Sequence, residues 1–332
     1  MGCNVARECE IGPDALGDTA MLWKSIRERA EAVLEMRGQL GGVSRLCPPK
    51  EVVDDTLKLL ITAKDGRRAA VIRWSSEVAP HGVAEETELA RKAKELLGAR
   101  LGAVVLDPLL TGEVGGRSFT MLPYCEPLKE SRVRWLVQRL LLAPRILEWL
   151  RLATECTARE ATEDQIESDF RLPLEFMMQN EQLGARIREE ARRAVRLLDD
   201  GHWRPKYVLA HNDLWKGNIL IRRGSGRDSP GEFRGVVVID WGSAVLRGHA
   251  MYDLIRLAQS MRVRRGRIAT EVRHHCRILG ATSECAKAYL LAALGHIGMH
   301  LGHFPVERYN FCAQICCQVL FAEVSDECRR DC

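Results

Sequence analysis

Residues 207–223 read YVLAHNDLWKGNILIRR, and residues 235–243 read GVVVIDWGS. The apolar runs VLAH, NILI and VVVID in these segments have the composition and length of short buried strands. Asp213 and Asn218 lie in the polar turn between the first two runs, and Asp240 ends the third run. Because strand ends hold side chains on a rigid scaffold, we expect these three residues to lie in a cleft.

The three side chains have the chemistry of metal-dependent phosphoryl transfer. Mg²⁺ takes oxygen ligands, commonly one or two carboxylates together with phosphate oxygens and water. Asn218 and Asp240 supply such oxygens, which leaves Asp213 to act on a hydroxyl group. The alternative is a β-meander with polar turns, which would not require these three residues at metal-compatible positions.

The spacing His211-x-Asp213-x-x-x-x-Asn218, followed by a strand that carries Asp240-Trp-Gly242, resembles the aminoglycoside phosphotransferase and choline kinase family, relatives of the protein kinases. The resemblance is sharp from residue 207 to residue 253, and it follows the motif order over most of the chain. It implies an α+β class with a bilobal protein-kinase-like fold. A small antiparallel β-rich lobe would bind the nucleotide over residues 1–123, and a larger, mainly α-helical lobe would span residues 124–332.

In that family ATP or GTP binds between the lobes, and the resemblance assigns Mg²⁺ to Asn218 and Asp240. Asp213 would orient a hydroxyl group of a small-molecule substrate and accept its proton as the γ-phosphoryl group moves. Lys216 either neutralises charge on the transferred group or is a surface lysine of the loop. His211 would hold the loop by packing and hydrogen bonding.

A glycine-rich segment in the first lobe is a candidate for nucleotide binding. Residues 38–46 read GQLGGVSRL and contain Gly41, Gly42 and Ser44. The glycines allow a backbone to approach a phosphate, and the serine adds a hydroxyl donor. The family has a short Gly/Ser loop over the nucleotide at this point, although these residues alone also fit a simple turn.

Arg73 stands where the family has a phosphate-binding lysine. It lies on the second of two strands that the Asp65-Gly66 turn joins into a hairpin. Arg73 either binds phosphate, which arginine does with two parallel hydrogen bonds, or is a charge in solvent. Residues 83–98 predict a helix that places Glu86 beside its apolar face, where it can pair with Arg73.

Glu85 and Glu88 compete with Glu86 for this pairing, and for each of them a solvated helix face is the alternative. Two further strands around a glycine turn follow, and the lobe boundary is expected after Pro123. The resemblance puts main-chain groups of Met121, Pro123 and Cys125 against the edge of the adenine.

Several helical segments have two interpretations. A leader helix is expected over residues 18–37. Residues 131–160, with a break at Pro144, fit an amphipathic partner or membrane helix, but core packing is favoured because Arg and Glu interrupt the apolar pattern. The acidic residues at 163–169 either bind a cationic substrate or form a solvated face. The basic run at 262–277 fits a solvated face, an anionic substrate or nucleic acid.

His296, His300 and His303 share one face of the helix expected at 283–303, a spacing that zinc can use. Close helix packing at Gly298 and Gly302 is favoured over a metal site. A last apolar helix is expected over residues 306–324.

Composition excludes some classes of protein. The chain has 332 residues, 46% hydrophobic and 28% charged, with a net charge of only +4, so neither a nucleic-acid partner nor a membrane partner is expected. No apolar run is long enough to cross a membrane, and the start lacks a signal peptide. The twelve cysteines include no CxxC pair, which favours reduced thiols and a cytoplasmic location. The oligomeric state is open.

Two other functions compete with a small-molecule kinase. The first is a catalytically weak nucleotide-binding scaffold of the same fold, which Arg73 and the unusual glycine segment favour. The second is a protein kinase, but no Ala-Pro-Glu motif or long activation segment follows Asp240. The acceptor is undecided between an aminoglycoside, a sugar and an amino alcohol.

Overall fold

The computed structural model describes residues 13–46, 56–129, 131–222, 233, 235–302 and 304–327. The chain divides into two compact units. Unit 1 takes Met1–Lys94, Ala103–Glu130 and Ile219–Gly242, and unit 2 takes Glu95–Gly102, Ser131–Asn218 and Ser243–Cys332. Antiparallel sheet dominates the first unit and helices dominate the second, which confirms the predicted α+β class. The predicted lobe boundary after residue 123 stays a prediction.

Unit 1 is built on a five-stranded antiparallel sheet in the order β1-β2-β3-β5-β4. Its strands are β1 (Leu40–Arg45), β2 (Leu57–Ala63), β3 (Arg68–Trp74), β4 (Leu110–Val114) and β5 (Arg117–Pro123). The predicted hairpin joins β2 and β3, because Gly66 adopts a φ of 80° that suits glycine in a tight turn.

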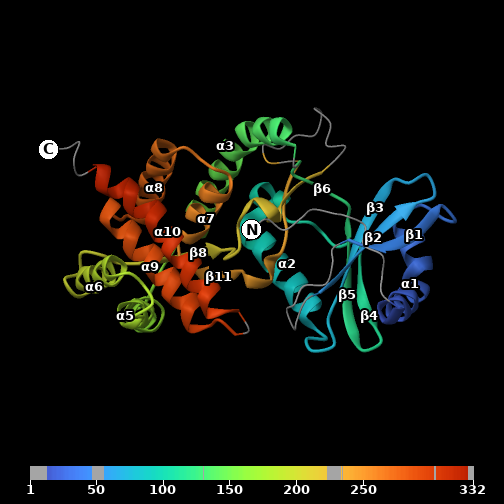
Figure 1. Ribbon diagram of the computed structural model, residues 1–332, viewed down its shortest axis with the longest axis horizontal. Coiled ribbons are helices and arrows are strands. Elements are labelled where there is room, and N and C mark those ends of the chain that lie inside the picture. The colour runs from blue at the N-terminus through green and yellow to red at the C-terminus, as the bar shows by residue number, and fades with distance from the viewer. Residues whose placement is uncertain are drawn as a thin grey trace. The chain divides into compact units, whose positions relative to one another are not determined.

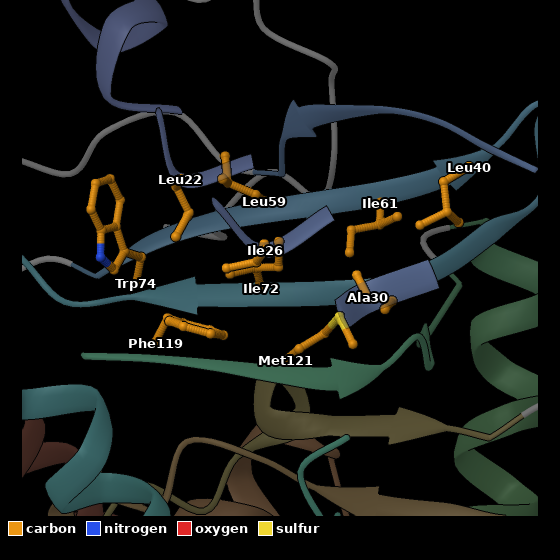
Figure 2. Packing of buried hydrophobic residues seen from close by; sticks show 11 residues of the cluster. Leu22, Ile26, Ala30, Leu40, Leu59, Ile61, Ile72, Trp74, Phe119 and Met121 are labelled. Atoms are coloured by element: carbon orange, nitrogen blue, oxygen red, sulfur yellow. The ribbon is translucent and has the colours of Figure 1, made fainter. Parts of the chain in front are cut away.

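Helix α1 (Pro13–Val33) covers one face of this sheet. Figure 2 shows how Leu22 and Ile26 of α1 meet Leu59 and Ile72 of the sheet in a cluster whose members are almost fully buried. Each such side chain contributes about 1.5–3 kcal/mol when it leaves water. Since neighbouring side chains in a strand point to opposite faces, Arg73 points away from α1.

The leader helix begins and ends earlier than the predicted range of residues 18–37. It ends at Val33 because Glu35 takes the left-handed conformation with a φ of 54° and the N–H of Met36 turns back to the carbonyl of Glu31. The Glu31 carboxylate also accepts the N–H of Gly38 at 3.0 Å, which turns the chain toward β1.

Helix α2 (Gly82–Leu101) starts beside the end of β3 and the beginning of β5. The hydroxyl groups of Ser75 and Ser118 accept the N–H groups of Val83 and Ala84 at 3.0 and 3.1 Å, which satisfies two free donors of its first turn. The helical geometry is interrupted at Gly98, which has a φ of 68°. The first turns of α2 are therefore fixed relative to β3 and β5.

The three apolar runs within residues 207–223 and 235–243 do not form a β-meander. β8 (Lys206–Ala210) pairs with β7 (Arg159–Glu160) and β11 (Val245–Gly248) in unit 2. β9 (Ile219–Ile221) instead pairs with β6 (Glu126–Pro127) and β10 (Val236–Val238) in unit 1. The chain thus passes from one unit to the other at the polar turn, and the β-meander alternative is wrong.

Most of α9 (Ser283–Met299) is buried against other helices of unit 2. α9 contacts α5 (Leu172–Gln179), α6 (Ala185–Asp199) and α10 (Val306–Glu327). Short helical turns α4 (Glu163–Ile166) and Glu167–Arg171 precede α5, and the second has π geometry. Helices α7 (Tyr252–Ser260) and α8 (Arg265–Leu279) complete the unit.

Helix α3 (Arg132–Thr157) corrects two expectations. Pro144 lies inside the helix and does not break it; the proline is exposed, so the carbonyl that it leaves unbonded can reach water. One side of the helix is buried from Leu142 onward, but its first turns carry exposed leucines and valines, so core packing is wrong for this part. No described helix is long and apolar enough to span a membrane.

Candidate active site

The polar turn after β8 is anchored to the start of α7. The Asp253 carboxylate accepts the N–H of His211 at 2.6 Å, and His211 Nδ1 accepts the N–H of Asp213 at 3.3 Å. Burial raises the pKa of Asp253 to about 6, although main-chain donors of His211 and Leu214 act in the opposite direction. His211 and Asp253 therefore both hold the loop through hydrogen bonds, the role that the resemblance implied for His211.

Asn218 orients Asp213. Its Nδ2 donates to the main-chain oxygen and to carboxylate Oδ2 of Asp213, each at 2.9 Å. Asn218 is buried, whereas the Asp213 side chain is 41% exposed. The structure thus brings these two predicted residues together and leaves the carboxylate accessible from solvent.

Two residues beside this loop escaped the sequence analysis. Arg256 of α7 lies with Nη2 3.8 Å from Oδ1 of Asp213. It follows Asp253 by three residues and so shares its helix face, a spacing that could have identified it. The second residue is Trp135 of α3, whose ring centre lies 5.2 Å from the ammonium group of Lys216, a contact that no sequence pattern signals.

A second group of predicted residues meets in unit 1. Arg73 forms an ion pair through Nη1 with Glu86 of α2, and its Nη2 lies 3.2 Å from Oδ1 of Asp240. The Arg73 side chain is only 13% exposed, so it is not a charge in solvent. Burial alone would lower the pKa of Arg73, but the carboxylates of Glu86 and Asp240 raise it.

The competing glutamates lie elsewhere. Glu85 is exposed, and Glu88 binds Arg91 on its own helix at 2.6 Å. Glu86 is therefore the glutamate of α2 that pairs with Arg73.

Asp240 lies two residues after β10 and has a φ of 69°, in the left-handed region that Asp tolerates better than most residues. The buried Trp241 that follows donates its Nε1–H to the carbonyl of Val238 at 2.9 Å. This closes a tight turn directly after the strand. A backbone outlier at a candidate ligand residue is typical of functional sites.

The glycine segment is a strand and not a loop. Gly41, Gly42 and Ser44 belong to β1, whose pairing with β2 is irregular between Leu40 and Gly42. A side chain at Gly41 would come within 3.1 Å of the carbonyl of Ala63, so close strand pairing explains this glycine. Nucleotide binding by these residues stays a prediction.

The predicted adenine contacts differ in their availability. Met121 is fully buried in the α1 core, and its carbonyl accepts the N–H of Leu109 at 2.8 Å. Cys125 is buried with Leu106 and Val237, and burial raises the pKa of its thiol. Pro123 ends β5 and is half-buried. Between these two residues, the N–H of Tyr124 donates to the carbonyl of Ala69 at 3.2 Å.

The proposed histidine face lies in unit 2. The rings of His249, His296 and His300 follow one another with centres 5.1 and 4.5 Å apart, while His303 lies outside the described residues. Among the residues that the structure describes, no three His, Cys, Asp or Glu side chains are grouped to hold a metal ion.

A model of the phosphotransferase enzyme family matches residues 57–289, which is more than half of the chain. The chain belongs to this family. Its membership confirms the predicted relationship and the predicted class of enzyme, a small-molecule kinase. A search of curated proteins finds no match.

Solved structures agree with the phosphotransferase family in their fold. The GDP complex of aminoglycoside 2'-phosphotransferase-IIIa is 13% identical with a TM-score of 0.53, and the match covers 94% of this chain and 99% of that one. A variant of that enzyme, also with GDP, is 13% identical with a TM-score of 0.50, and the match covers 94% of this chain and 97% of that one. The choline kinase LicA from Streptococcus pneumoniae is 14% identical with a TM-score of 0.49, and the match covers 91% of this chain and 99% of that one. The first two confirm the predicted protein-kinase-like fold.

Proposed function

We propose that this phosphotransferase moves the γ-phosphoryl group of ATP or GTP to a hydroxyl group of a small molecule, with Asp213 as the base. The observation that carries the proposal is the pair of 2.9 Å hydrogen bonds from Asn218 to Asp213. They hold an accessible carboxylate in one orientation, as a group that must align a hydroxyl for in-line transfer requires.

In this proposal Asp213 mainly orients the hydroxyl group, because proton transfer is late when the transition state is loose. Arg256, 3.8 Å from the carboxylate, is a positioning residue that restrains it from the α7 side. Lys216 lies in the same loop, exposed to solvent, and neutralises charge on the transferred group in this proposal.

Asn218 and Asp240 fit a magnesium ion by their chemistry. The Nδ2 of Asn218 is engaged by Asp213, so the carboxamide oxygen is the atom that remains for a cation. Asp240 adds a carboxylate that is 33% exposed. Both are hard oxygen donors of the kind Mg²⁺ takes, and a bound Mg²⁺ neutralises phosphate charge.

Arg73 is proposed to contact the α- and β-phosphates, with Glu86 holding its guanidinium group in place. Main-chain groups between Pro123 and Cys125 are proposed to contact the purine base of the nucleotide. The strand β1 is proposed to lie near the bound nucleotide in the same lobe. The solved relative contains GDP, so both ATP and GTP are tested.

The acceptor is proposed to be aminoglycoside-, sugar- or amino-alcohol-like. The named relatives act on aminoglycosides or choline, which carry positive charge. Two acidic residues of the 163–169 run already have partners, since Glu167 binds Arg171 at 2.7 Å and Asp169 accepts the Tyr207 hydroxyl at 2.5 Å. This run therefore gives little support for a cationic acceptor.

Asp213→Asn tests the base role. Release of nucleoside diphosphate is measured with MgATP and MgGTP against aminoglycosides, choline and simple sugars and amino alcohols. Turnover should fall by about a hundredfold or more while nucleotide affinity stays near that of the native protein. Asp200→Asn, at an exposed residue after α6, is the matched control. Full turnover in Asp213→Asn would exclude the base role.

A nucleotide-binding scaffold with weak catalysis is the second candidate. The 3.2 Å contact between Arg73 and Asp240 favours it, because an arginine on this carboxylate competes with a metal ion. Asp240→Ala should remove the Mg²⁺ dependence of nucleotide binding if Asp240 is a ligand. Magnesium-independent nucleotide binding by the native protein, without turnover of any acceptor, would favour the scaffold.

The seven cysteines that the structure describes as free thiols suit a reducing compartment. We therefore propose a cytoplasmic location, where the nucleotide substrate is also available.

A further inference from the structure

The first three turns of α3 carry an apolar stripe on their solvent side. The side chains are 46–72% exposed and recur at positions i, i+3, i+4, i+7 and i+8, namely Val133, Leu136, Val137, Leu140 and Leu141. These five residues are called the α3 stripe. Scattered exposed apolar residues are normal, but a continuous stripe on one helix marks an interaction surface.

The α3 stripe lies opposite the face by which the helix packs. At about 100° per residue, the stripe covers the side of α3 away from Leu142, Ile146 and Trp149, all of which are buried. Trp135, whose ring meets Lys216, also lies on the packed side. Substitutions in the stripe therefore leave both the core of unit 2 and the catalytic loop in place.

Arginines border the α3 stripe on both sides. The same helical spacing puts Arg132 and Arg139 along one flank and Arg134 and Arg145 along the other. Residues 131–147 contain no Asp or Glu, so the charged side chains directly beside the stripe are all basic, and the first acid of the helix, Glu148, lies about two turns beyond Leu141. A basic amphipathic helix with this arrangement is typical of proteins that lie on a membrane surface.

The charge beside the α3 stripe also distinguishes between the partners that could bind it. A second copy of this chain seated on the α3 stripe would bring the arginine flanks of both copies together, and like charges in contact oppose association. An anionic lipid surface instead meets both arginine flanks at once, because it is flat and negative throughout.

We propose that the α3 stripe docks the protein on an anionic membrane surface. The five apolar side chains enter the boundary between headgroups and acyl chains, and the flanking arginines extend their heads to the lipid phosphates. The stripe is only about 12 Å long at 1.5 Å per residue, so docking is reversible and depends on charge. The proposal does not rest on the acceptor or on the roles of the catalytic residues.

Vesicle sedimentation with the full chain tests the proposal. The protein should sediment with phosphatidylcholine–phosphatidylglycerol vesicles at low salt, should not sediment with pure phosphatidylcholine, and should be released by added salt. Absence of sedimentation with the anionic vesicles at excess lipid would overturn the proposal.

Variants separate the α3 stripe from general basic charge. Val137→Glu/Leu140→Glu changes two exposed residues and should abolish sedimentation. Arg134→Gln/Arg139→Gln should weaken partitioning by about fivefold for each arginine. Arg273→Gln/Arg277→Gln removes the same charge from the exposed face of α8 and should have little effect.

Two outcomes would contradict the role of the stripe. In one, Val137→Glu/Leu140→Glu binds anionic vesicles as tightly as the native chain. In the other, the native chain is a dimer that ignores vesicles and that this variant converts to a monomer, which would make the stripe a protein interface. Circular dichroism and the melting temperature of each variant exclude unfolding as the cause.

Discussion

One guanidinium group contacts two carboxylates in unit 1, since Arg73 reaches Glu86 with one arm and Asp240 with the other. A lysine presents a single point charge and cannot hold two acids in this fixed fork. The departure from the family's lysine therefore has a structural consequence. Asp240, the proposed metal ligand, is already in contact with a cation before any metal ion binds.

We expect Arg73→Ala to weaken binding of MgATP by about tenfold or more, because phosphate would lose a charged donor pair. It should also cost about 3 kcal/mol of unfolding free energy, since it leaves the mostly buried Glu86 without its partner. Calorimetric titration and urea unfolding measure the two effects.

Arg73→Lys should have a nucleotide affinity and a stability between those of the native protein and those of Arg73→Ala, because lysine keeps the charge but lacks the forked guanidinium group. Arg67→Ala, at an exposed arginine of the same hairpin, is the control. Unchanged nucleotide affinity in Arg73→Ala would mean that this arginine serves only to hold Glu86 and Asp240.

At the scale of elements, glycines fix how closely α9 approaches its neighbours. A side chain at Gly295 would overlap the carbonyl of Pro173 in α5, and one at Gly298 would come within 2.5 Å of the ring of Phe176. The obstacle at Gly295 is main chain, which cannot rotate away. These two helices therefore pack through backbone contact on this face.

Gly295→Ala should lower the free energy of unfolding by about 3 kcal/mol, the upper range for overpacking a core. Gly266→Ala is the matched control, because a side chain there meets nothing within 4 Å and alanine favours a helix by about 0.5–1 kcal/mol. Urea unfolding of both variants measures the difference. Equal stability of the two would show that α5 and α9 can separate without cost.

Local sequence signals predicted most elements but not their surroundings. The Asp65-Gly66 hairpin and α2 came from turn chemistry and helical periodicity. The exposed α3 stripe escaped because periodicity gives the apolar face of a helix but not whether another element covers it. The predicted helix break at Pro144 was wrong because a helix interior tolerates proline where the rest of the helix is held by packing.

At the scale of the whole molecule, the site was predictable where it is local in sequence. Asp213 and Asn218 are five residues apart, so their spacing implied a shared loop. The contact of Arg256 with Asp213 and the passage of the chain between units after Asn218 depend on tertiary packing. No single-sequence pattern encodes such distant pairings, which is why β8 and β9 were expected on one scaffold.

The stability of the molecule should fall in mild acid, because burial lowers the pKa of His249 to about 4 from 6.5. His249 therefore binds a proton more tightly in the unfolded chain than in the folded one. Its contribution to the free energy of unfolding is complete above pH 6.5 and is lost as the pH falls toward 4. A shift of this size corresponds to about 3 kcal/mol. Urea unfolding from pH 7 to pH 4 should show a smaller loss in His249→Gln, whereas the control His202→Gln, at an exposed residue, should follow the native protein. An unaltered pH dependence in His249→Gln would mean that His249 gains its proton without leaving the folded structure.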